Sequence, residues 1–99
     1  MAKRLTSVFT DDMDTCIFTG SKDVERHHII GKTKVNKQMC EKYGFIVPLR
    51  PDLHPNGARA NHRYSKQIDL HLKKMAQEYF EEHYGSRVEW MRLFDRNYL

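Results

Sequence analysis

The chain has few of the features that stabilise secreted proteins or anchor membrane proteins. Only two of its 99 residues are cysteine, Cys16 and Cys40, and they do not form a CxxC pair. A disulfide framework would need more cysteines, so we expect a reduced, intracellular protein located in the cytoplasm. No apolar run is long enough to cross a bilayer and no secretory signal opens the chain. We therefore expect no membrane partner.

Glycine and proline are also scarce, with five glycines and three prolines, and no segment has low complexity. This excludes a long disordered or linker-rich chain. Hydrophobic residues make up 39% of the sequence, enough for one compact core but not a large one. No internal repeat or domain boundary is visible. The length and composition predict one small globular domain.

Acidic residues are scarce in the middle of the chain. Residues 26–66 contain nine Lys or Arg but only two acidic residues, Glu41 and Asp52, which gives this segment a net charge of +7. Residues 67–99 are close to neutral, at −1. A concentrated basic surface favours a polyanionic partner, most simply nucleic acid. Charge alone leaves a second interpretation open, namely a solvated basic face with no ligand.

Hydrophobic periodicity and turn residues predict a mixed α and β architecture. The expected elements are a hairpin of residues 15–20 and 24–30, a helix over 33–43, a strand over 45–49, a loop over 50–57, a long helix from 59–64 to Gly85, and a last helix opened by the capping box of Ser86 and Glu89. Gly44 should stop the first helix, and Pro48 should confine its strand to a sheet edge.

The long helix is expected to have an apolar side and a polar side. The apolar side comprises Tyr64, Ile68, Leu72, Met75, Tyr79 and Phe80, and the polar side comprises Lys66, Asp69, Lys73, Lys74, Gln77 and Glu81. In the last helix Trp90 and Phe94 are spaced to contact each other.

Four histidines are the candidate functional residues. His27 and His28 are adjacent in an expected strand, and His54 and His62 follow in or after the turn-rich loop. Neutral imidazole is a common ligand for divalent metals, and a catalytic site needs about three protein ligands and an open position. His27, His54 and His62 could be the ligands, which leaves His28 to act as general base.

Strand alternation places Glu25 and His27 on one face and Arg26 and His28 on the other, so a local twist or bulge is needed for both histidines to serve one site. The alternative interpretation of any single histidine is an ordinary polar surface residue. We assign His71 and His83, on the long helix, to that class.

Several segments together resemble the HNH (His-Me finger, ββα-metal) nucleases, most closely the small phage-encoded type. The segments are residues 24–31, residues 44–49, Leu53-His54, His62, and the closing Phe-Asp-Arg-Asn-Tyr-Leu of residues 94–99. The resemblance extends from Cys16 to the C-terminus.

The resemblance implies an α+β fold, in which a small ββα-metal core precedes a long C-terminal helix and a final short helix. Its expected parts are an N-terminal arm (1–14), the ββα-metal core (15–72) and a C-terminal helical extension (73–99). It implies a DNA endonuclease, involved in phage-related DNA processing, that acts as a monomer or weak homodimer.

The resemblance also implies residue roles. His27 is a metal ligand, His28 is the general base, His54 and His62 are candidate ligands, and Glu25 orients the site. The cofactor is one divalent ion (Mg, Mn, Ni or Zn). Basic side chains near the site would hold the phosphate backbone without reading sequence. They are Arg26, Lys32, Arg59, Arg63 and Lys66.

The chain departs from the family pattern in two places. Many members hold a structural zinc in two cysteine pairs, but here Cys16 is followed by Thr19, and the downstream positions are Arg50 and Leu53. We therefore expect no cysteine-bound zinc. The middle Asn of the HNH motif is also absent near Gly44. Asn36, Asn61 and a backbone carbonyl are the candidates to replace it.

Two other functions stay open on sequence grounds. One is a non-catalytic nucleic-acid-binding module in which the histidines hold a structural metal. The other is a small helical interaction domain that uses the apolar side of the long helix as a partner surface, although a chain this short needs that side for its own core.

Overall fold

The computed structural model describes residues 5–55 and 57–99, except for the side chain of His62. Within these residues the chain forms a small α+β domain with a two-stranded sheet and three α-helices, which confirms the expected fold class at that level. The elements are β1 (Glu25–His28), α1 (Lys34–Tyr43), β2 (Ile46–Leu49), the 3₁₀ turn η1 (Pro51–Leu53), α2 (His62–His83) and α3 (Arg87–Phe94). None of the described helices combines the length and apolarity needed to cross a bilayer.

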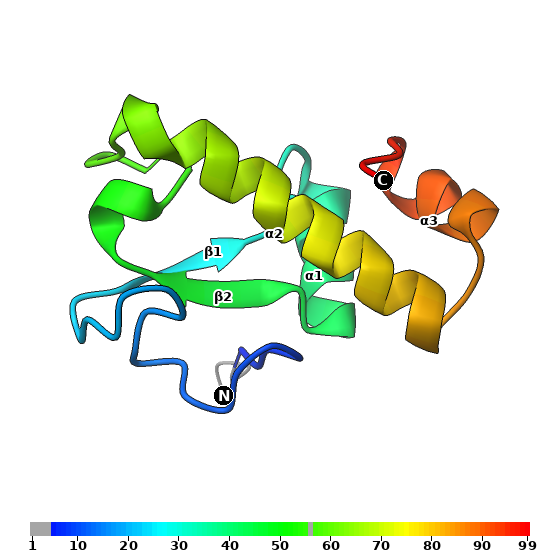
Figure 1. The fold of residues 1–99 in the computed structure, drawn as a ribbon. Helices are drawn as coiled ribbons and strands as arrows, with labels where there is room; N and C mark the ends of the chain where they lie inside the picture. Colours follow the sequence, from blue (N-terminus) through cyan, green and yellow to red (C-terminus); the bar gives the residue numbers. More distant parts are fainter. Residues whose placement is uncertain (1–4, 56) are drawn as a thin grey trace.

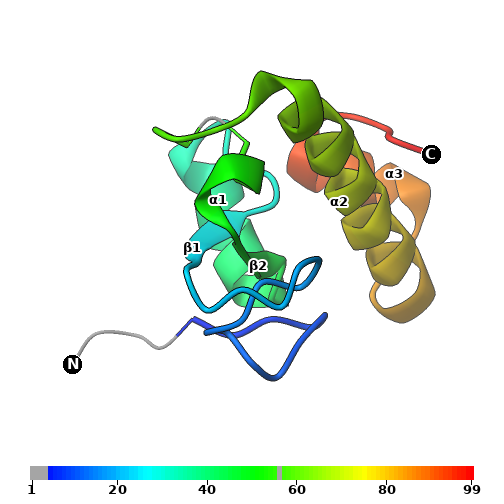
Figure 2. The ribbon, with the colours of Figure 1, turned by 60° about the vertical axis from the view of Figure 1, so that its left-hand side comes forward.

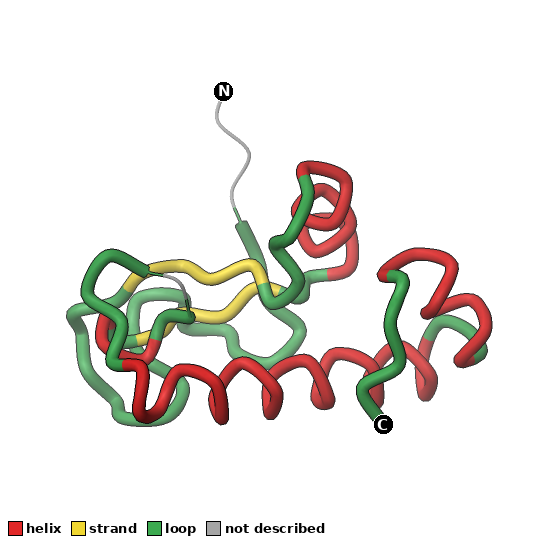
Figure 3. The backbone as a smooth tube through the Cα atoms, turned by 90° about the horizontal axis from the view of Figure 1, so that it is seen from above, coloured by secondary structure: helices red, strands yellow, loops and turns green. Residues whose placement is uncertain are grey.

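The sheet is antiparallel, and its register pairs Glu25 with Leu49 and His28 with Ile46. Helix α2 runs alongside the two strands (Figure 1), and the turned view places α1 and α2 on different sides of the sheet (Figure 2). Seen from above, α3 and the C-terminal tail lie at the far end of α2 from the sheet (Figure 3). The site-bearing strand β1 is therefore held between two helices.

The expected hairpin is wrong. Residues 15–20 form a turn rather than a strand, closed by the Cys16 N–H donating to the Ser21 carbonyl (2.8 Å) and the Gly20 N–H donating to the Cys16 carbonyl (3.0 Å). Gly20 has a φ of 75°, a left-handed value that turns the backbone back on itself. The partner of β1 is instead β2, so the sheet forms between two strands that are separated in sequence by α1.

The ends of the helices confirm the sequence signals. The Thr33 side chain caps α1 by accepting from the Asn36 N–H (3.0 Å), and Gly44 ends it with a φ of 77°. A Cβ at Gly44 would lie 2.9 Å from Val8 Cγ1, so this position also lets the N-terminal arm approach closely. The capping box of Ser86 and Glu89 opens α3 as expected.

The apolar side of α2 is predicted only in part. Leu72 and Phe80 are buried and Ile68, Met75 and Tyr79 pack partly against the core, but Tyr64 is 44% exposed. Tyr64 lies in the first turn of the helix, away from the core. The buried side chains of β2 form part of that core.

Gln77, expected on the polar side of α2, is fully buried. Its Nε2 donates to Asn97 Oδ1 (2.8 Å) and its Oε1 accepts from the Tyr98 N–H (2.7 Å). The C-terminal tail folds back over this face of the helix, and the amide satisfies the tail's polar groups. Hydrogen bonding therefore compensates the burial that the helical pattern did not predict.

One hydrophobic cluster joins the expected core to the expected C-terminal extension. Phe45, next to β2, contacts Trp90 (ring centroids 6.1 Å apart) and Phe94 (6.2 Å), and Trp90 and Phe94 lie 4.4 Å apart as their spacing predicts. The Trp90 indole also donates to the Arg96 carbonyl (2.8 Å). The extension thus completes the core.

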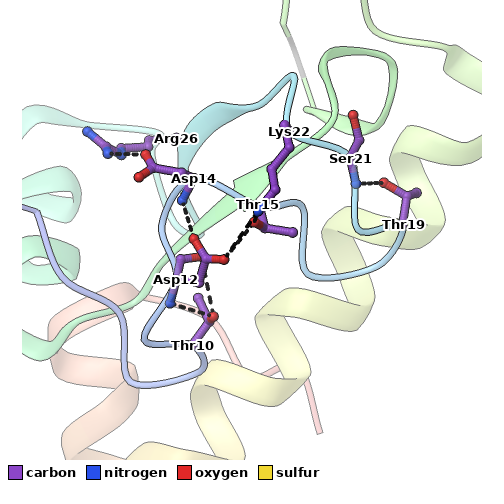
Figure 4. Close-up of polar contacts among 8 residues, drawn as sticks. All are labelled: Thr10, Asp12, Asp14, Thr15, Thr19, Ser21, Lys22 and Arg26. Carbon is purple, nitrogen blue, oxygen red and sulfur yellow. Dashed lines mark hydrogen bonds and ion pairs between the residues drawn. The ribbon is translucent and has the colours of Figure 1, made fainter.

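The loop before β1 is tied together by short-range polar contacts (Figure 4). Asp12 accepts from the Thr15 hydroxyl (2.6 Å) and the Asp14 N–H (3.0 Å). The hydrogen bond from Thr15 is the main reason why the pKa of the exposed Asp12 lies below its usual value. Asp14 also pairs with Arg26 Nη2 (3.3 Å), which connects this loop to the second residue of β1.

Cys40 gives a pH-dependent prediction. Its thiol is buried, contacts the N–H and carbonyl of Ile30 (both 3.4 Å), and has a pKa raised to about 11, chiefly by burial. Between pH 9 and 11 the unfolded thiol loses its proton and the folded one keeps it, so stability falls as pH rises. From pH 8 to pH 10 this group should lower the free energy of unfolding by about 1.4 kcal/mol.

The measurement is urea unfolding of the protein and of Cys40→Ala at both pH values. The stability difference between the two proteins should shrink by that amount at pH 10. An unchanged difference would contradict the raised pKa.

Candidate metal and phosphate site

A cleft of about 530 Å³ opens beside β1. Its walls come from β1, the Gly31 turn, α1, the loop after η1 and the middle of α2. The lining residues are Arg26, His27, His28, Gly31, Lys32, Lys37, His54, Pro55 and Lys73. Three of the four candidate histidines therefore border a single cavity.

His27 and His54 lie side by side in this cleft, with ring centroids 4.9 Å apart and planes at 64°. His27 is 8% exposed, and its buried Nε2 has no hydrogen-bond partner among the described residues. Burial chiefly, together with the positive charges of the neighbouring His54, His28 and Lys73, lowers the pKa of His27 to about 3. His27 is therefore neutral near pH 7. In the tautomer whose proton is on Nδ1, the buried Nε2 carries a lone pair that accepts no hydrogen bond from the described residues.

Glu25 fixes the other histidine. Its Oε1 lies 2.7 Å from His54 Nδ1, and because a carboxylate only accepts, Nδ1 must carry the proton. In the neutral imidazole the lone pair is then on Nε2, the arrangement usual for a metal-ligating histidine. Glu25 and His27 lie on the same face of β1 as alternation predicts, and Glu25 orients His54.

His28 is on the opposite face of β1, yet it borders the same cleft. Its Nε2 lies 3.7 Å from Glu41 Oε2 on α1. Sequence analysis missed Glu41 as a partner of His28. One signal was available, because Glu41 is one of only two acidic residues in the basic segment 26–66.

The candidates to replace the middle Asn do not contact His28 in the described structure. Asn61 Oδ1 accepts from the Arg63 N–H and caps α2. Asn36 is buried in the first helical turns of α1 and lines a different cavity. Among the described side chains, the carboxylate of Glu41 is the polar group that approaches His28.

The third expected metal ligand, His62, begins α2, but its side chain lies outside the described residues. Among the described residues, those of the histidine cleft included, no group of three or more His, Cys, Asp or Glu side chains is arranged to hold a metal ion. The assignment of His62 stays a prediction, and the described part of the site provides two imidazoles.

Four cationic side chains line the cleft, and no carboxylate is among its lining residues in the described structure. Arg26 and Lys32 were expected there, whereas Lys37 and Lys73 were not. Lys73 was assigned to the polar side of α2, but it is half-buried and held by Asp69 (Nζ to Oδ2, 2.8 Å). The cleft therefore concentrates positive charge around the two paired imidazoles.

The remaining basic candidates lie outside the cleft. Arg59, Arg63 and Lys66 are exposed, and Arg59 is 3.9 Å from Asp23. Their expected role in holding nucleic acid stays a prediction, and it would concern a surface outside the cleft. His71 and His83 are also exposed, as expected for ordinary surface histidines.

Cys16 and Cys40 are both buried and free. Burial raises the pKa of Cys16, but hydrogen bonds from the Thr19 side chain and the Arg50 backbone outweigh it and bring the pKa below its ordinary value. Residues 16–19 and Arg50 thus lie together, and the expected absence of a cysteine-bound zinc there stays a prediction.

No protein-family model matches this chain significantly, nor does any curated protein or any solved structure. Its function has to be inferred from the geometry and charge of the histidine cleft.

Proposed function

We propose that the protein is a metal-dependent endonuclease of the HNH type that hydrolyses phosphodiester bonds in DNA, in phage-related DNA processing. The observation that carries the proposal is the pair of imidazoles of His27 and His54 in a cleft lined by four cations. A site of this composition suits a metal ion and a polyanion together.

The donor set fits a divalent ion such as Mg, Mn, Ni or Zn. An unpartnered buried polar atom costs about 1–3 kcal/mol, so the orphaned Nε2 of His27 calls for a ligand. His27 and His54 would hold the ion, with His62 as the proposed third ligand. When bound, such an ion neutralises a phosphate oxygen and stabilises the leaving oxygen.

The chain's own side chains supply the rest. His28 takes the proton of the attacking water, and the Glu41 carboxylate lies 3.7 Å from its Nε2. Glu25 keeps His54 in the ligating tautomer. Arg26, Lys32, Lys37 and Lys73 hold the phosphates on either side of the scissile bond.

In this proposal β1, β2 and the start of α2 are the ββα-metal core, within residues 15–72. The arm of residues 1–14 and the extension of residues 73–99 support that core.

A second candidate is a non-catalytic nucleic-acid-binding module with a structural metal. It is favoured by one observation, that neither Asn36 nor Asn61 contacts His28 in the described structure. A base lacking its usual amide partner would be less well oriented.

The test uses supercoiled plasmid and purified protein with Mg²⁺, Mn²⁺ or Ni²⁺. The proposal expects nicked or linear plasmid with metal and none after chelation by EDTA. Salt-sensitive DNA binding without cleavage under any of these metals would favour the binding module. If the protein neither binds nor cleaves DNA, both candidate functions are overturned.

A further inference from the structure

A second cleft lies directly beside the histidine cleft. It has a volume of about 350 Å³ and is bounded by the Gly31 turn, the start of α1, the middle of α2 and the C-terminal tail. Its lining residues are Ile30, Gly31, Lys32, Thr33, Asn36, Lys73, Phe94, Asp95, Arg96 and Tyr98. Gly31, Lys32 and Lys73 line both clefts, so the two cavities share a wall.

Asn36 is the unusual residue of this second cleft. It is 7% exposed, and its side-chain amide makes no hydrogen bond with the described residues. Asn36 is one of the lining residues of the second cleft. An amide that has no hydrogen-bond partner among the described residues can bond to a ligand, and the cavity that Asn36 lines is able to contain a small one.

The charges of the second cleft favour an anion. Lys32, Lys73 and Arg96 line it, against the single carboxylate of Asp95. Lys73 is fixed at the junction of the clefts, with its Nζ 2.8 Å from Asp69 Oδ2 and 5.5 Å from the centre of the Tyr98 ring. A phosphate at this junction would contact cations that serve both cavities.

The wall formed by the C-terminal tail is rigidly built. Gln77 bonds both Asn97 and the Tyr98 N–H, and the Trp90 indole bonds the Arg96 carbonyl. These contacts hold the tail against α2 and α3, so the cleft is preformed rather than created by a mobile end. Preformed sites of this kind bind ligands at a lower entropic cost.

We propose that the second cleft is a nucleotide subsite. It takes the nucleotide next to the phosphodiester in the histidine cleft, with the shared phosphate on Lys32 and Lys73 and the edge of the base on the Asn36 amide. This inference rests on the proposed function. An amide presents a donor and an acceptor side by side, which matches adenine best, so the subsite prefers adenine.

Gly31 forms the passage between the clefts. A Cβ built there meets nothing closer than 3.5 Å, and the φ of Gly31 lies outside the left-handed range, so the backbone accepts a residue that has a side chain. The atoms nearest that Cβ belong to His28 and Lys37, so a larger side chain would extend into the histidine cleft next to its border with the second cleft. Gly31→Phe should block a strand that runs through both clefts and leave a single nucleotide in the second cleft unaffected.

The experiment measures binding of fluorescent oligodeoxyadenylate and oligodeoxythymidylate of about eight nucleotides by anisotropy. The protein is expected to bind the adenine strand about tenfold more tightly, and Asn36→Ala should remove this preference. Gln38→Ala, which removes an exposed amide from the same helix outside both clefts, is the matched control and should keep it.

Gly31→Phe gives an independent readout. It should weaken both strands about tenfold and leave the affinity for deoxyadenosine monophosphate unchanged. If Asn36→Ala destabilises the fold, this variant alone decides. Equal binding of both strands by the unmodified protein, or full binding by Gly31→Phe, would overturn the subsite.

Plasmid nicking, measured on the same samples, separates this inference from the proposed function. If the protein nicks plasmid but neither Asn36→Ala nor Gly31→Phe changes oligonucleotide binding, the subsite is overturned and the proposed nuclease function is retained. Adenine preference that depends on Asn36, without nicking under any metal, supports the subsite and overturns the nuclease.

Discussion

His28→Ala is expected to reduce metal-dependent plasmid nicking by about 10²–10⁴-fold, the usual contribution of a positioned general base. His28 lines the cleft from the face of β1 opposite His27, and its Nε2 lies 3.7 Å from the Glu41 carboxylate. Removing the imidazole takes away the proposed acceptor for the water's proton and leaves both His27 and His54 in place. Binding of Mn²⁺, measured by calorimetry, should therefore be preserved.

His71→Ala is the control, because His71 is exposed on α2 and does not line the histidine cleft. Its nicking rate should equal that of the unmodified protein. Full activity in His28→Ala would remove His28 from the mechanism, and loss of Mn²⁺ binding in that variant would instead make His28 a ligand.

Trp90→Ala is expected to lower the free energy of unfolding by about 3–5 kcal/mol. The side chain is fully buried, its ring lies 5.7 Å from Phe80 and 4.4 Å from Phe94, and its indole donates to Arg96. The substitution leaves a cavity where α3 meets α2 and an unpaired carbonyl in the tail. A domain of this size has only about 5–15 kcal/mol to lose, so much of the protein should unfold on mild warming.

Urea unfolding followed by circular dichroism measures this loss. Val88→Ala, at a position on the same helix that is 60% exposed, should change stability by less than about 0.5 kcal/mol. A loss below about 1 kcal/mol in Trp90→Ala would mean that the C-terminal helix is dispensable for the core.

The helices were predictable because the signals that bound them are local. Thr33 caps α1 and Gly44 ends it, and the pair of Ser86 and Glu89 opens α3 through bonds that span three residues. Such contacts form within a few residues of chain and need no knowledge of the rest of the fold. The spacing of Trp90 and Phe94 carries the same kind of local information.

Strand pairing was not predictable in this way. The apolar residues 15–20 lie close to β1 in sequence, but Gly20 closes them into a turn, and β1 pairs with β2 beyond an intervening helix. Which strands pair depends on how side chains that are distant in sequence become buried together. The residue pattern within one strand does not identify its partner.

For the candidate site, the sequence by itself predicted which residues are candidates for the chemistry, and strand alternation determined that Glu25 and His27 share a face of β1. Only the tertiary structure decided which groups meet them. The loop after η1 brings His54 against His27 and Glu25, α1 brings Glu41 to His28, and α2 places the half-buried Lys73 between two clefts. Residue type and period are local properties of a chain, whereas burial and charge pairing arise only when distant segments pack together.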